Sequence, residues 1–223
     1  MNYVSWGDAA RFSNWLQNGQ PTAAEGPGTT ETGAYTLNGA ITNAALMAVG
    51  RNPGAVWFIP SENEWYKAAY YKGGGLNSGY WLYPTQNDIT PSNVLSATGT
   101  NNANFNANPG YTDPVNYLTS VGAFAASPGP YGTFDQGGDV WEWNETAQTA
   151  TSRGRRGGAF SGGSAAVLSG TRFSAFPMGV FPNFGFRVAS VPEPATVILL
   201  LSGVLLFLIW RVRQAQARRP GTR

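Results

Sequence analysis

The sequence predicts a packed, loop-rich domain of a few helices and short strands, followed by one C-terminal transmembrane helix. The chain has 223 residues, enough for one ordinary domain and a tail. Glycine occurs 29 times and aromatic residues make up 13% of the chain, whereas only 12% of residues are charged. This composition argues against a helical bundle and against a disordered chain. The third observation is a long uncharged stretch close to the C-terminus, which ends in arginines.

The chain contains no cysteine and no histidine. Without cysteine it cannot form disulfides, thiolate metal sites, iron–sulfur clusters or a cysteine nucleophile. Without histidine it cannot use imidazole for metal binding or for acid–base catalysis. These two absences exclude most common enzyme mechanisms.

The basic pI of about 9.0 arises from the C-terminal tail. Five arginines follow residue 210, whereas residues 1–190 carry nine basic and eleven acidic side chains. A basic tail on a slightly acidic domain gives no reason to expect a nucleic-acid partner.

The first predicted helix begins almost at the start of the chain. Ser5 and Asp8 have the spacing of a capping box, apolar residues follow at helical intervals, and Asn18-Gly19 ends the pattern. Residues 1–5 have neither the basic nor the apolar region of a signal peptide. We therefore expect the domain to be incomplete at its N-terminus, with Met1 an internal or wrongly assigned start.

The middle of the chain repeats this pattern. Residues 55–59 predict a buried strand that Pro60 stops, and Ser61 with Glu64 forms a second capping box, opening a helix that ends at the glycines 73–75. The long stretch 80–135 shows no periodicity, and we expect ions or ligands to be candidates for holding it. Further short strands are predicted at 140–143, 156–161 and 184–189.

Residues 195–210 form a 16-residue stretch without a charge. As a helix it would be about 24 Å long, slightly less than a hydrocarbon core of about 30 Å, and Trp210 and Arg211 can extend it to the interface. The alternative is a buried core helix, which would normally carry a polar face. The arginine cluster predicts a cytoplasmic C-terminal end, with the bulk of the chain in the periplasm or at the cell surface.

The order of features at the C-terminus resembles the PEP-CTERM sorting signal of bacterial surface proteins. The resemblance rests on Val191, Pro192, Glu193 and Pro194, the apolar stretch and the arginine run. It implies export, and processing by an exosortase, a membrane protease. The predicted division is therefore a domain at 1–190 and a sorting tail at 191–223.

A second resemblance covers residues 3–190. Its motifs are F-I-P-S-E-x-E-W from Phe58, G-G-D-V-W-E-W from Gly137, R-G-G-x-F from Arg156 and G-F-R-V-A from Gly185. They resemble the sulfatase-modifying-factor family, also called the formylglycine-generating enzyme family. The resemblance implies the α+β, irregular, C-type-lectin-like fold of that family.

The chemistry of the family does not transfer with the fold. The family's oxidases use a pair of cysteines that bind copper, and Gly162 occupies the position that aligns with the first of them. The related sulfoxide synthases hold iron with histidines, which this chain lacks. We therefore assign no catalytic residue.

Structural calcium is the cofactor that the resemblance does imply. Calcium takes six to eight oxygen ligands, and a glycine-rich turn allows carbonyl groups to converge. The alternative is a solvated turn with a capping carboxylate. The first implied site comprises the Asp135 side chain, the Gly138 and Val140 carbonyls and the Glu142 carboxylate; the second comprises Asn104, the Phe105 carbonyl and Asp113.

Other candidate sites have simpler explanations. Glu62 and Glu64 could be paired catalytic carboxylates, but the helix start explains both. Three arginines at 153, 155 and 156 could bind phosphate or sulfate, or form a solvated face, or pair with buried carboxylates. Five aromatic residues could form a sugar-stacking surface, although most of them are expected to lie in the core. They are Trp81, Tyr83, Tyr111, Tyr117 and Tyr131.

Two classes of function remain open. The first is a non-catalytic, surface-directed domain that binds an exopolysaccharide or a surface protein, because folds of this kind present variable loops on a rigid base. The second is a metal-dependent oxidoreductase with unrecognised ligands. The missing cysteines and histidines favour the first.

Overall fold

The computed structural model describes residues 1–74, 79–107 and 110–191. The chain divides into two compact units, Met1–Ala189 and Ser190–Arg223. The predicted membrane span at 195–210 lies outside the described residues. Within the described residues, every helix is too short or too polar to cross a bilayer.

The first helix begins where the sequence predicts. In α1 (Trp6–Gln17), the Ser5 Oγ accepts from the Asp8 backbone N at 3.1 Å, and the Asp8 carboxylate accepts from the Ser5 backbone N at 2.9 Å. A further helix, α2 (Asn43–Ala48), was not predicted, although Thr42 caps it in the usual way. Strand β1 is limited to Trp57–Phe58.

The second capping box is also confirmed, in α3 (Glu62–Tyr70). The prediction that this helix continues to the glycines 73–75 was wrong. Tyr71 has an extended backbone and forms a β-bridge with Tyr80. The Trp81 backbone N donates to the Tyr70 carbonyl at 2.7 Å. The segment that follows α3 therefore forms a hydrogen bond with a carbonyl group at the C-terminal end of the helix.

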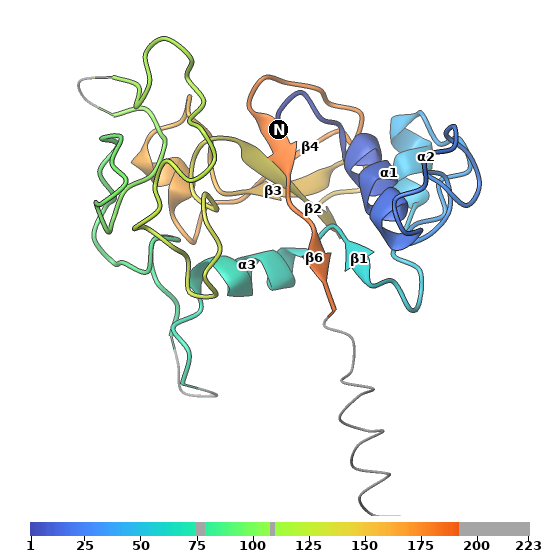
Figure 1. The fold of residues 1–223 in the computed structure, drawn as a ribbon, viewed down its shortest axis with the longest axis horizontal. Coiled ribbons are helices and arrows are strands. Elements are labelled where there is room, and N and C mark those ends of the chain that lie inside the picture. Colours follow the sequence, from blue (N-terminus) through green and yellow to red (C-terminus); the bar gives the residue numbers. More distant parts are fainter. Residues whose placement is uncertain (75–78, 108–109, 192–223) are drawn as a thin grey trace, which may run out of the picture. The chain divides into compact units, whose positions relative to one another are not determined.

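A mixed four-stranded sheet forms the centre of the first unit (Figure 1). Its strands are β2 (Trp141–Ala147), β3 (Arg153–Arg156), β4 (Phe173–Ala175) and β5 (Phe184–Phe186). Their order is β4-β3-β2-β5, in which β2 is antiparallel to β3 and parallel to β5, and β3 is antiparallel to β4. A two-stranded sheet joins β1 to β6 (Ala189–Ser190). The separate helices and this mixed sheet establish the α+β class. A 3-10 helix, η2 (Ser164–Val167), lies between β3 and β4 in the chain.

Two predicted strands differ from the structure. The strand expected at 156–161 ends at Arg156, because Gly157 and Gly158 turn the chain with φ of +94° and +75°. The strand expected at 184–189 is divided into β5 and β6.

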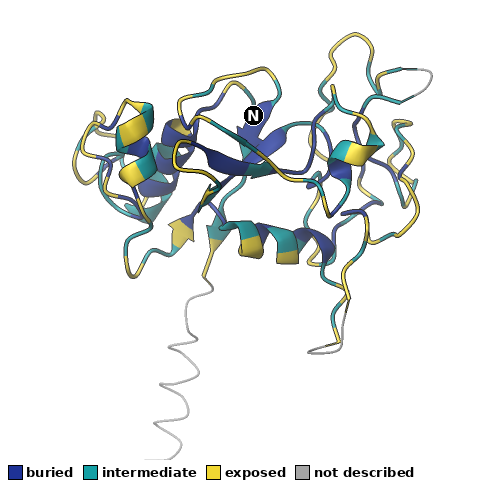
Figure 2. Cartoon of the chain, turned by 180° about the vertical axis from the view of Figure 1, so that it is seen from behind, coloured by how far each residue is buried: buried dark blue, intermediate teal, exposed yellow. Residues whose placement is uncertain are grey.

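The main core lies between α1, the sheet and the segment around Tyr35 (Figure 2). Trp6 and Trp143 are fully buried there, and the Trp6 ring meets the Tyr35 ring edge-on with centroids 5.6 Å apart. A smaller cluster, which includes Trp65 and Tyr70, is formed by the buried side chains of α3, and this helix packs against β2. These contacts fix α3 relative to the sheet.

The stretch 80–135 contains no regular helix or strand where it is described, as predicted. In Figure 1 its green and yellow loops lie on the opposite side of the sheet from α1 and α2. Side-chain amides hold these loops: the Nδ2 atoms of Asn101, Asn102 and Asn104 donate to backbone carbonyls at 3.1, 2.8 and 2.8 Å. Asparagine side chains therefore supply the hydrogen bonds that a sheet would otherwise supply.

Candidate functional site

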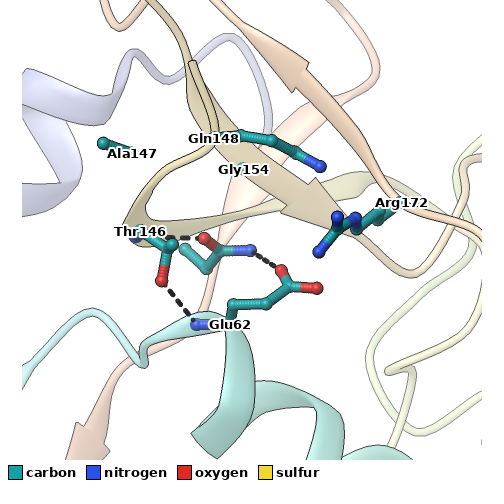
Figure 3. Close-up of a pocket in the computed structure, with 7 residues that line it drawn as sticks. Glu62, Thr146, Ala147, Gln148, Gly154 and Arg172 are labelled. Carbon is teal, nitrogen blue, oxygen red and sulfur yellow. Dashed lines mark hydrogen bonds between the residues drawn. The ribbon is translucent and has the colours of Figure 1, made fainter. Parts of the chain in front are cut away.

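A polar cleft of about 230 Å³ opens between the first turn of α3 and strands β2 and β3 (Figure 3). The alternation of polar residues along β2 places Asn144 and Thr146 on one face of the strand. This alternation was not predicted to mark a site, although it is visible in the sequence of β2. The cleft is lined by Glu62, Asn144, Thr146, Ala147, Gln148, Gly154 and Arg172.

Glu62 is the centre of a tight hydrogen-bond network in this cleft. Its backbone N donates to the Thr146 Oγ1 at 3.0 Å, and its carboxylate accepts from the Asn144 Nδ2 at 2.6 Å and from the Arg156 Nε at 2.5 Å. Asn144 is fully buried, and a Cβ on Gly154 would lie 2.6 Å from its Oδ1. The floor of the cleft is therefore rigid, and the position opposite Asn144 requires glycine.

Arg172 supplies the cation at the opening of the cleft. It is exposed, and no carboxylate among the described residues pairs with it. The Gln148 amide is best oriented with its oxygen accepting from the Arg172 Nε at 3.0 Å and its nitrogen donating to the Phe173 carbonyl at 2.8 Å. The Gln148 side chain thus orients the Arg172 guanidinium, which lines the cleft (Figure 3).

A second polar cleft, of about 280 Å³, adjoins the first, since Thr146 and Ala147 line both. Arg51 lies in it between two carboxylates, 2.6 Å from Glu145 and 2.6 Å from Glu64. Burial alone would raise the pKa of Glu64, but hydrogen bonds from Arg51 and Ser61 outweigh burial and lower it to about 2. This second cleft therefore contains an ion-pair network in which one arginine binds two carboxylates.

The expectation for Glu62 and Glu64 is confirmed in its simpler form. Glu64 completes the capping box of α3, and Glu62 in the first turn forms an ion pair with Arg156. Arg156 therefore matches the expectation of an arginine that pairs with a buried carboxylate.

Arg153 has a different role from any that the sequence suggested. Its guanidinium is buried, donates to the carbonyls of Leu46 and Val49 at 2.6 Å each, and lies 3.6 Å above the Trp6 ring. It therefore satisfies carbonyl groups at the C-terminus of α2 through Nη2, and Nη1 donates to the Glu145 carbonyl, whereas its buried Nε has no partner among the described residues.

The first predicted calcium set includes a carboxylate that already has partners. Both oxygens of buried Glu142 accept hydrogen bonds from Arg187, and the Trp65 Nε1 donates to one of them at 2.7 Å. Burial, and then the charge of Asp139, raise the pKa of Asp135. A calcium ion here would have to displace Arg187, so calcium at this set stays a prediction.

The second set has one oxygen that lacks a donor. Asn104 is buried, its Nδ2 donates to the Tyr117 carbonyl and to Asp139, and its Oδ1 has no hydrogen-bond partner. Asp113 is occupied in its own turn, where it accepts from the backbone N of Val115 and Asn116. Within the described ranges, no cluster of three or more acidic residues is arranged to hold a metal ion.

Gly162, which the resemblance is expected to align with the family's first catalytic cysteine, lies in a closely packed turn. The Gly162 carbonyl accepts from the Asn106 backbone N at 2.8 Å. A Cβ on Gly162 would lie 3.0 Å from the Ala166 Cβ. The close packing around this position therefore suits glycine better than a larger residue. Gly162 lines neither polar cleft.

The aromatic residues divide between core and surface. Tyr83 is buried and Trp81 is half-buried, as expected. The expectation of core positions was wrong for Tyr111, Tyr117 and Tyr131, which are 38%, 43% and 54% exposed. The Tyr111 and Tyr117 rings meet edge-on with centroids 4.8 Å apart, which gives the loop region an exposed aromatic surface.

Comparison with protein-family models gives two matches. The sulfatase-modifying factor enzyme 1-like domain matches residues 1–191, and the PEP-CTERM protein-sorting motif matches residues 190–214. No curated protein shows a significant match.

Among solved structures, variable protein 1 of Treponema denticola is 20% identical, with a TM-score of 0.54; the alignment covers 86% of this chain and 71% of that one. CarF is 19% identical with a TM-score of 0.49, over 86% and 68% of the two chains. PvdO of Pseudomonas aeruginosa is 18% identical with a TM-score of 0.49, over 86% and 62%. The first of these likenesses supports the fold.

Proposed function

Because the chain belongs to the sulfatase-modifying factor enzyme 1-like domain family and carries a PEP-CTERM sorting motif, we propose that it is an exported, non-catalytic binding domain of the cell envelope. Family membership supplies the scaffold, and the motif supplies the destination. The binding role is the part that requires an argument from the residues.

The observation that carries the proposal is the absence of cysteine and histidine from all 223 residues. Copper and iron sites of proteins depend on thiolate or imidazole ligands, so a redox metal of the family's kind does not fit this chain. The tight packing at Gly162 agrees with this, because a larger side chain there would press on Ala166.

The ligand that suits the cleft of Figure 3 is a hydroxyl-rich polymer such as an exopolysaccharide. The cleft offers a carboxylate, amides, a hydroxyl and a guanidinium, which together donate to and accept from sugar hydroxyls. Its network is already formed, so binding would order few side chains. Tyr111 and Tyr117 do not line the cleft, but their exposed rings offer an aromatic surface on the loops for sugar rings.

The tail completes the proposal. Exosortase would act near Val191, Pro192, Glu193 and Pro194, and the arginine cluster would stay in the cytoplasm before processing. The apolar stretch at 195–210 would hold the chain in the membrane until then. The domain would thereby face the periplasm or the cell surface.

A structural calcium ion at Asn104 is a further part of the proposal. The buried Oδ1 lacks a donor, and a buried oxygen without a partner is unfavourable unless a proton donor or a cation satisfies it. If calcium binds there, the full chain in detergent will melt at a higher temperature in calcium than in chelator. An Asn104→Ala variant would lose that difference, and a wild-type protein insensitive to chelator would contradict calcium binding.

The binding role is tested by affinity electrophoresis of the full chain in gels that contain purified acidic or neutral exopolysaccharide. We expect retardation that falls at least fivefold in the double variant Arg172→Met, Gln148→Ala. The matched control is Lys67→Met, which removes an exposed cation of α3 outside the cleft. Equal retardation of the cleft variant and the control would refute the cleft as the site.

Metal analysis separates this proposal from the alternative of a metal-dependent oxidoreductase. The binding domain should contain no stoichiometric copper or iron after purification from cells supplied with both metals. Either metal at one equivalent per chain would support the oxidoreductase instead.

A further inference from the structure

A large apolar hollow in the first unit lies beside β4 and shares no lining residue with the polar cleft. It has a volume of about 660 Å³ and lies between β3, β4 and the loop that leads into β5. A hollow of this size suits a small organic molecule. Its apolar lining comes mainly from Ala175, Phe176, Met178, Phe181 and Phe184.

Arg155 gives this apolar hollow a positive charge. Its guanidinium carbon lies 3.9 Å above the Phe184 ring and 5.3 Å from the centroid of the Trp141 ring. Its Nη2 donates a long hydrogen bond of 3.5 Å to the Ser174 carbonyl, and its buried Nε has no partner among the described residues. No carboxylate among the described residues pairs with it.

The other core arginines show what is unusual about Arg155. Arg156 and Arg187 each bind a glutamate, and Arg153 donates to backbone carbonyls. Burial lowers the pKa of Arg155 to about 10, so it remains charged at neutral pH. Arg155 is partly buried, and a partly buried cation without an anion is unfavourable, so a bound anion would lower that cost.

The rim of the hollow is held in place by backbone hydrogen bonds. The Tyr3 N donates to the Phe181 carbonyl at 3.1 Å and the Trp6 N donates to the Pro177 carbonyl at 2.9 Å. The Met178 N donates to the Asn43 Oδ1 at 3.0 Å. Although Phe176 and Phe181 are 59% and 50% exposed, the loop that carries them is therefore fixed before any ligand arrives.

From this combination we propose that the hollow is a binding site for a small aromatic carboxylate, whose ring packs on Phe181 and Phe184 and whose carboxylate pairs with Arg155. A guanidinium matches a carboxylate with two parallel hydrogen bonds. Thr151 and Ser152 also line the hollow; the Ser152 hydroxyl is hydrogen-bonded to the Thr149 hydroxyl at 2.6 Å, so the Thr151 hydroxyl is the one that can donate to the carboxylate. A neutral ligand of the same shape would leave the cation unpaired.

Calorimetric titration of the full chain in lipid nanodiscs tests this site, with 2-naphthoate as the anionic probe and 2-naphthalenemethanol as its neutral counterpart. We expect saturable binding of one naphthoate, with heats from empty nanodiscs subtracted. Arg155→Met should raise the Kd for naphthoate at least tenfold and change the weak binding of the alcohol less than twofold. Lys67→Met, which removes an exposed cation of α3 outside the hollow and outside the polar cleft, should leave both unchanged.

Phe181→Ser provides an independent readout, because it should weaken naphthoate and the alcohol together. Four results would overturn the proposal: no binding of naphthoate above the nanodisc background, equal affinity in the Arg155→Met variant, equal losses in the Arg155→Met and Lys67→Met variants, or unchanged affinity in the Phe181→Ser variant.

Discussion

The ion pair between Glu142 and Arg187 allows the most detailed prediction of stability. Replacement by Glu142→Gln keeps the size of the side chain and removes its charge. The glutamate side chain is 6% exposed and that of Arg187 is 22% exposed, so the arginine is left with little water in place of its anion. The Trp65 Nε1 also loses a charged acceptor at 2.7 Å.

Removing one partner of a buried ion pair costs about 3–5 kcal/mol. Partial exposure of Arg187 places this variant at the lower end, about 3 kcal/mol. For a domain of this size, each kcal/mol lowers the Tm by about 2–4 °C, so a decrease of about 6–12 °C is expected. In a double-mutant cycle, the combination of Glu142→Gln and Arg187→Met should cost about 2 kcal/mol less than the sum of the single changes.

Urea unfolding of the full chain in mild detergent, followed by tryptophan fluorescence, measures these energies. The measurement is made in calcium and again in chelator, because Glu142 is also a predicted calcium ligand. The ion-pair account expects the same loss in both solutions. A loss that disappears in chelator, or a pair of single changes that simply add, would refute the ion-pair account.

Three further predictions concern other parts of the domain. Gly138→Ala should destabilise the domain by about 3 kcal/mol or more in the same unfolding assay. The reason is that φ at Gly138 is +83° and the new Cβ would lie 2.0 Å from the Asn104 carbonyl oxygen. A loss below about 1 kcal/mol would contradict this packing. Glu64→Gln should cost about 1 kcal/mol at pH 7 after allowance for its exposure. Because the pKa of Glu64 is lowered from 4.5 to about 2, the cost should be complete above pH 4.5 and vanish as the pH falls towards 2; a pH-independent difference would contradict the Arg51 pair. Arg172→Met should leave the unfolding free energy within about 0.5 kcal/mol of the wild type, and a larger loss would mean that this arginine is structural.

Local sequence signals predicted the helices well where the signal and its partner lie a few residues apart. Both capping boxes, at Ser5 and at Ser61, depend only on contacts across one helical turn. The short helix α2 was missed because six residues give too little periodicity. The predicted end of α3 lay beyond the observed end because Tyr71 leaves the helix to form a β-bridge with Tyr80, a contact that the local pattern does not show.

The candidate sites were less predictable because their residues meet only through the tertiary fold. Glu62 and Asn144 are 82 positions apart, and Arg187 and Glu142 are 45 positions apart. The motif around Glu142 indicated a site but could not show that Arg187 would bind both of its oxygens. Likewise, the arginines at 153, 155 and 156 are neighbours in sequence, yet each has a different environment.

The central claim is that this chain keeps the family's scaffold without its oxidative chemistry. The most direct test incubates the purified full chain with copper, oxygen and a peptide carrying the single thiol that the family's oxidases convert to an aldehyde. The account predicts that mass spectrometry will find the peptide without aldehyde above a protein-free copper control. Catalytic conversion of the thiol to an aldehyde would contradict the claim.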